Sequence, residues 1–106
     1  MTPNQRQIAF ERLFTAIAKR RAERLGMAYV GTIRRLAPPP LPGETAGTTL
    51  YYLNAVPSSG QGPTLVGLGA AADAQLRKAE TWVATGKGAA PVPPAAGKRR
   101  GLKRKV

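Results

Sequence analysis

The first apolar pattern in the chain is helical and covers residues 2–25. On a helical wheel most of the apolar side chains fall within one arc, with polar residues opposite. The members of this stripe are Phe10, Leu13, Phe14, Ile17, Ala18 and Leu25. Ile8 falls outside it. Thr2 can cap the helix, with Asn4 as the alternative cap. Pro3 suits the first helical position, and Gly26 stands where a left-handed residue ends a helix.

Alternation replaces the helical period over residues 27–36 and predicts a strand. With a period of two, Tyr29 and Ile33 are expected on one face and Arg34 on the other. Gly31, between them, either weakens the strand or marks a β-bulge. Arg34 and the next residue, Arg35, are expected to leave the strand on opposite faces.

Residues 37–47 are rich in proline and glycine and predict an irregular, stiff connection. The proline run within them is either a ligand for an aromatic groove or, more commonly, a loop between strands. Residues 48–56 are rich in β-branched and aromatic side chains and predict a strand with both faces at least half covered. The turn residues of 57–63 and a short strand over 64–68 complete a hairpin.

The last regular pattern predicts a second helix over residues 70–85. Its apolar stripe consists of Ala72, Leu76, Ala79 and Val83. Trp82 lies at the stripe's edge and is either a core residue or one that stacks on a base or a partner. Asp73 can pair with Arg77 one turn later. Gly86 ends the helix.

Between the last strand and this helix stands Gly67-Leu68-Gly69. A Gly-x-Gly turn from strand to helix can cradle a phosphate group, but the βαβ unit and downstream acid of a dinucleotide site are missing. The alternative is a sharp turn with no ligand.

Together these patterns predict one small α+β domain over residues 2–86. Two helices, one N-terminal and one C-terminal, cover one face of a three-stranded, mainly antiparallel sheet in the order α-β-β-β-α. A Gly/Ala/Pro linker over 87–97 leads to a basic tail, 98–106, expected to be disordered when free. The predicted core comprises Phe10, Leu13, Phe14, Ile17, Tyr29, Ile33, Leu50 or Tyr51, Leu53, Val66, Leu76, Trp82 and Val83.

Charge changes this picture, because the chain carries seventeen Lys and Arg against five Asp and Glu, a net charge of +12. Residues 1–36 hold eight basic and two acidic residues, and residues 98–106 hold six basic ones. Residues 37–97 hold three of each sign. Positive charge therefore concentrates at both ends, a distribution typical of proteins that bind nucleic acid. An anionic membrane surface or an acidic protein is the alternative partner.

The candidate nucleic-acid contacts are the cations of these two regions. They are Lys19, Arg20, Arg21, Arg24, Arg34, Arg35, Lys98, Arg99, Arg100, Lys103, Arg104 and Lys105. Those near the end of the first helix also suit its macrodipole, so a purely structural role for them stays open. The tail could equally act as a solubilising charge run.

The sequence offers few residues that could act in catalysis. The chain has neither histidine nor cysteine, which argues against imidazole bases, thiolate nucleophiles and most transition-metal sites. The five acids stand apart, without the spacing of an acid–base pair. We therefore expect a protein that is not an enzyme and needs no metal or cofactor.

The helix–strand–strand–strand–helix order resembles two nucleic-acid-binding families. One is the double-stranded-RNA-binding domain, whose second helix starts with phosphate-gripping lysines, whereas residues 70–75 here are Ala-Ala-Ala-Asp-Ala-Gln. The other is the arm-type DNA-binding domain of tyrosine recombinases, similar to residues 49–53, 65–69 and the Ala-rich helix ending in Gly-Lys-Gly. The latter resemblance implies a sheet that enters a major groove.

The sequence thus predicts a non-enzymatic protein that binds DNA or RNA through phosphates, largely without sequence preference. The alternative is a structural subunit of a larger assembly, such as a virion or a ribonucleoprotein particle. Its partners would be nucleic acid and, through assembly, other proteins or further copies of itself. The N-terminus lacks a signal peptide and no apolar run could span a membrane. We expect a location in the cytoplasm or within a nucleic-acid-containing particle.

Overall fold

The computed structural model describes residues 1–45, 47–88 and 90–92. Its elements follow the expected α-β-β-β-α order, and each lies within two residues of its expected bounds. They are α1 (Pro3–Leu25), β1 (Ala28–Arg35), β2 (Leu50–Val56), β3 (Thr64–Gly67) and α2 (Ala70–Thr85). The predicted basic tail, 98–106, lies outside the described residues.

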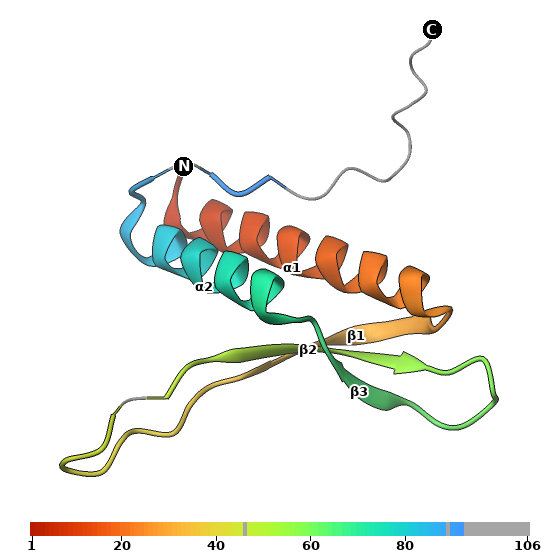
Figure 1. The fold of residues 1–106 in the computed structure, drawn as a ribbon. Coiled ribbons are helices and arrows are strands. Elements are labelled where there is room, and N and C mark those ends of the chain that lie inside the picture. Colours follow the sequence, from red (N-terminus) through yellow and green to blue (C-terminus); the bar gives the residue numbers. More distant parts are fainter. Residues whose placement is uncertain (46, 89, 93–106) are drawn as a thin grey trace, which may run out of the picture.

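The three strands form one antiparallel sheet with β2 in the centre, between β1 and β3. Both helices lie on the same side of this sheet (Figure 1). The prediction of a small α+β domain with two helices over one sheet face is therefore confirmed. The opposite face is covered by neither of these helices.

Local signals set the ends of α1 as expected. The Thr2 hydroxyl accepts a hydrogen bond from the Gln5 N–H (3.1 Å), and the Gln5 side chain accepts one from the Thr2 N–H (2.8 Å). This reciprocal capping box satisfies two N–H groups that a helix otherwise leaves unpaired. At the other end Gly26 adopts φ +68°, a left-handed conformation that favours glycine, and the chain turns into β1.

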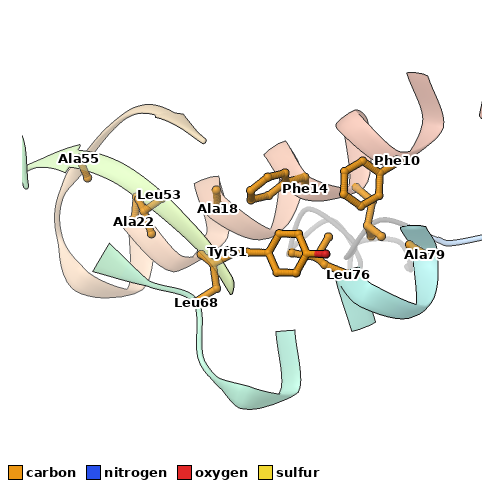
Figure 2. Close-up of a cluster of buried hydrophobic side chains, with 11 residues drawn as sticks. Phe10, Phe14, Ala18, Ala22, Tyr51, Leu53, Ala55, Leu68, Leu76 and Ala79 are labelled. Carbon is orange, nitrogen blue, oxygen red and sulfur yellow. The ribbon is translucent and has the colours of Figure 1, made fainter. Parts of the chain in front are cut away.

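The core lies between the helices and the inner face of β2. Tyr51, Leu53 and Ala55 alternate into it and are at most 1% exposed. The Phe14 ring meets the Tyr51 ring edge-on, with 5.4 Å between centroids and 89° between planes, a favourable aromatic geometry. Figure 2 shows this cluster. Its other members are Phe10, Leu13, Ala18, Ala22, Leu68, Leu76 and Ala79.

Most predicted core positions are confirmed. Of the pair Leu50 and Tyr51, the tyrosine is the core residue, and Trp82 is buried rather than available for stacking. Four predicted core residues are only partly buried but pack against the cluster: Ile17, Tyr29, Val66 and Val83. Ile8, outside the predicted stripe, is 44% exposed.

The prediction that Ile33 shares the core face with Tyr29 is wrong, because a β-bulge intervenes. Tyr29 pairs with Ala55, but Gly31 pairs with the preceding residue Asn54, so Val30 is an extra residue without a partner. One extra residue exchanges the faces expected for all that follows. Ile33 therefore points away from the helices and is 40% exposed. Arg34, predicted on the face opposite Tyr29, lies instead on the same face as Tyr29.

The outer side of β2 agrees with the prediction that both faces of this strand are at least half covered. Leu50 is 38% exposed, and Tyr52 on the same side is half-buried. The sheet therefore has one packed face and one face that is partly open to solvent.

The two helices run antiparallel, which decides what meets at each end. Arg6, near the start of α1, donates from Nε to the Val83 carbonyl near the end of α2 (3.0 Å). The end of α1 consequently lies beside the start of α2.

The predicted Asp73–Arg77 pair is not formed. Arg77 donates instead to the Thr49 carbonyl (3.0 Å), and Asp73 Oδ1 is buried without a hydrogen-bond partner among the described residues.

Candidate nucleic-acid interface

Three of the predicted basic residues of α1 converge on one pocket. Arg20 and Arg24 are one turn apart and Arg21 lies three residues before Arg24, so all three share one side of the helix. They line a shallow pocket of about 250 Å³ together with Ile17, Leu68, Ala71 and Ala72. Among the described lining residues none is acidic. We call this the arginine pocket.

The floor of the arginine pocket includes the first turn of α2. That helix begins at Gly69, which adopts φ +100° and offers no side chain to bond the first amides. Helix N-termini carry partial positive charge and present N–H groups that suit an anion. Arginines from α1 and the amide end of α2 thus bring positive charge to one place, which Asp73 in the first turn of α2 partly offsets.

Within the arginine pocket Arg21 is half-buried, and its Nε has no hydrogen-bond partner among the described residues. Arg24 is exposed. A guanidinium group presents several N–H donors in a plane and can bind two phosphate oxygens at once. The arrangement is therefore suited to phosphate or another oxyanion.

Lys19, predicted as part of the same patch, points elsewhere. Its Nζ lies 5.6 Å from the centroid of the Tyr29 ring, a cation–π contact. Lys19 thus belongs to the side of α1 that faces β1, away from the arginine pocket.

Arg34 is held by a structural contact on the helix side of the sheet. Its Nη1 lies 2.5 Å from Glu80 Oε2, and the other oxygen of Glu80 accepts a hydrogen bond from the Tyr51 hydroxyl. Burial, followed by the hydrogen bond to Glu80 and its negative charge, raises the pKa of Tyr51 above its ordinary range. Glu80 thus links β1, β2 and α2. Arg34 remains partly exposed at this contact.

Arg35 stands apart from all of these. It pairs with Leu50, and both side chains belong to the outer face of the sheet. The prediction that Arg34 and Arg35 leave the strand on opposite faces is confirmed. The remaining predicted contacts, in the tail, lie outside the described residues.

The sequence predicted the arginines but not their surroundings. The sequence predicts a turn at Leu68 and a helix that contains Ala71 and Ala72. Only the packing of α2 against α1 brings these three residues to the arginines. One signal pointed this way, because Gly67-Leu68-Gly69 has the form of a phosphate cradle. That signal and the basic end of α1 meet in space.

Comparisons with known proteins leave this site to be interpreted on its own. No family model, no curated protein and no solved structure matches the chain. The resemblances to the double-stranded-RNA-binding and arm-type domains therefore stay expectations.

Two features are absent from the residues that the structure describes. Neither α1 nor any other helix described by the structure combines the length and apolar character needed to cross a membrane. Within the same residues no three acidic side chains gather as a group that could hold a metal ion.

Proposed function

We propose that this protein binds nucleic acid through phosphate contacts, largely without sequence preference, and that the arginine pocket is the contact on its folded domain. The observation that carries the proposal is the convergence of Arg20, Arg21 and Arg24 beside the amide end of α2. The basic tail would add affinity, because each neutralised phosphate releases counterions.

Non-enzymatic binding suits the pocket's chemistry. Its described lining consists of arginines and apolar side chains, which can hold an anion but offer no general acid or base for a reaction at neutral pH. Arginine–phosphate contacts set position rather than sequence. A binder of this kind would accept many sequences.

The test is a salt titration of binding to random duplex and to single strands. A variant with Arg20, Arg21 and Arg24 all changed to alanine should bind duplex about tenfold or more weakly. Its plot of log affinity against log salt should be less steep by up to about 0.9 for each phosphate that is no longer neutralised.

The matched control changes three exposed cations elsewhere, Arg12, Lys78 and Lys87, to alanine. Its net charge falls by the same amount. Equal weakening in both variants would show that only net charge matters and would exclude the pocket as the contact. Failure of the full chain to bind at low salt would exclude nucleic-acid binding itself.

The tail is tested by a chain ending at residue 97, which lacks six cations. We expect the salt dependence of this shortened chain to be the least steep of all, since each neutralised phosphate contributes to the slope. Unchanged binding would assign all phosphate contacts to the folded domain.

A second candidate function, a structural subunit of a larger assembly, is favoured by a separate observation. The outer face of the sheet exposes apolar side chains, among them Ile33, Leu50 and Leu65. Several exposed apolar side chains on one face are a common feature of interaction sites. The hydrodynamic mass of the purified protein tests this candidate, and a monomer at every concentration, without retained partners, would argue against it.

A further inference from the structure

The outer face of the sheet is built by the alternate residues of its three strands. Because Tyr51, Leu53 and Ala55 point toward the helices, Leu50, Tyr52 and Asn54 point the other way. Register then places Ile33 beside Tyr52, and Leu65 beside Asn54. Figure 1 shows this face turned away from both helices.

All three strands contribute apolar side chains to this face, and Asn54 is a polar residue near its centre. The exposed fractions are 40% for Ile33, 38% for Leu50 and 43% for Leu65, and Val30 at the bulge is 52% exposed. Among the described strand residues on this face, only Arg35 carries a charge. A sheet with one such face resembles one half of a two-layer packing.

Two glycines give the face relief. Gly67 pairs with Tyr52 and Gly31 pairs with Asn54, and a side chain added at either glycine would meet open space. The bulky residues beside them therefore stand next to shallow depressions. A surface with both projections and depressions can fit a copy of itself.

The chemistry of the outer face limits the kinds of partner that could bind there. Unpaired bases bind on aromatic platforms, but this face has one aromatic residue, Tyr52, among aliphatic neighbours. The chain's own segment 98–106 has six cations in nine residues, which is unsuited to an apolar surface. A second apolar sheet fits best.

We propose that a second copy of this chain covers the outer face, sheet against sheet, about a two-fold axis. Sheets in such packings lie about 10 Å apart with their inner side chains interdigitated. The interface would be isologous, with the same residues contributed by both copies. This inference is independent of the proposed nucleic-acid binding, because it involves none of the arginines in the pocket, and it deepens the second candidate function, which rests on the same face.

Charge is compatible with this pairing despite the net charge of +12 on each copy. The helices of each copy would lie on the outside, and the arginine pocket lies between those helices. The two pockets would be separated by both sheets, at several times the screening length of about 8 Å at physiological salt. Repulsion between them is therefore small.

The size of the face limits the kind of pairing that it can support. About ten strand residues face outward, fewer than the 20 to 30 residues per partner of a standard interface. The pairing therefore belongs to the weak or transient class of interfaces rather than to obligate dimers.

The first experiment measures mass by sedimentation equilibrium over a range of micromolar concentrations, in salt high enough to keep nucleic acid off. The wild-type chain should shift with concentration from 11.2 kDa to twice that mass. Ile33→Glu should weaken pairing at least about tenfold, because it places like charges in a desolvated interface. Circular dichroism confirms that the variant is folded.

The control is Ile8→Glu, the same change at a site of similar exposure, 44%, on α1. It should leave the dissociation constant within about twofold, since it lies outside the proposed interface. A monomeric wild type at all these concentrations, or equal weakening by both variants, would overturn the proposal.

A second measurement does not depend on Ile33→Glu being folded. The chain has no cysteine, so a single introduced cysteine reports only its own contacts. Asn54→Cys, at the centre of the face, should be linked into a dimer by a bifunctional maleimide long enough to span the roughly 10 Å between packed sheets, and Ile8→Cys should remain monomeric. Cross-linking through Ile8→Cys alone, or through neither site, would overturn the placement of the second copy on this face.

Discussion

At the scale of single residues, Glu80 is the most consequential polar group of the domain. It accepts a hydrogen bond from the Tyr51 hydroxyl and forms an ion pair with Arg34, so one carboxylate binds polar groups from two strands. Because Tyr51 is 1% exposed, its hydroxyl would otherwise be buried without a partner, at a cost of about 1–3 kcal/mol.

This contact predicts how stability depends on pH. The pKa of Tyr51 is higher in the folded protein than in the unfolded chain, where it is about 10. The stabilisation is therefore present below pH 10 and declines above it, by about 1.4 kcal/mol per pH unit. In Tyr51→Phe this component should be absent.

The measurement is urea unfolding of both proteins from neutral pH to beyond the ordinary tyrosine pKa of about 10. At neutral pH Tyr51→Phe should be less stable by about 1 kcal/mol. Parallel decreases in stability above that pKa would contradict the assignment to Tyr51.

Burial predicts a contrast between two leucines on helices. Leu76 is fully buried whereas Leu25 is 44% exposed. Leu76→Ala should lower the free energy of unfolding by about 2–5 kcal/mol, because it removes apolar contacts and leaves a cavity. Leu25→Ala should cost less than about 1 kcal/mol. Similar decreases in urea unfolding would contradict the placement of the core.

At the scale of elements, the ends of α1 are set by residues that a sequence can reveal. Thr2, Pro3 and Gly26 have the roles that their types predict. The apolar stripe indicated the buried face over most of the helix and accounts for the exposure of Ile8. Its last member, Leu25, is nevertheless 44% exposed. Local chemistry was sufficient for these features because each depends on residues within one or two turns.

The features that could not be predicted depend on distant packing or on one extra residue. Gly31 raised the option of a bulge, but only the pairing with β2 shows that Val30 is the residue left over. The arginine pocket required the antiparallel helix pairing, which Arg6 helps to fix from 77 residues away in the chain. Sequence patterns contain neither relation.

The left-handed end of α1 predicts a contrast between two glycines. Gly26→Ala should cost about 1–2 kcal/mol, because an added methyl group disfavours its φ of +68° although it would contact no neighbour within 4 Å. Gly62→Ala also meets open space but lacks a positive φ, and should be neutral or slightly stabilising. Thermal unfolding compares them, and equal shifts would contradict the role of backbone strain.

At the scale of the whole molecule, the arginine pocket and the apolar face of the sheet lie on opposite sides. The arginine pocket lies between the helices, and the apolar face lies beyond the sheet. A dimer formed through that face would present phosphate-binding sites in opposite directions. Such a particle could hold two segments of nucleic acid together.

The excess of positive charge predicts stabilisation by a polyanion. Random duplex that binds the folded chain should raise its stability by about 2.7 kcal/mol when its free concentration is a hundredfold above the dissociation constant. Relief of self-repulsion acts in the same direction. Thermal unfolding with duplex or with a neutral polymer measures the effect. Equal midpoints with both additives, or persistence of the shift at high salt, would contradict it.

Because of the bulge, β1 contains one residue, Val30, that has no cross-strand partner. Because Tyr29 already pairs with Ala55 and Gly31 with Asn54, deletion of Val30 would leave a regular strand with the same partners and the same faces. In β2 every residue has a partner, so a deletion there would exchange the faces of half the strand. Over evolution, β1 could therefore lose one residue while Arg34 remains paired with Glu80 and Ile33 remains on the outer face of the sheet. The central strand β2 could not lose a residue in this way.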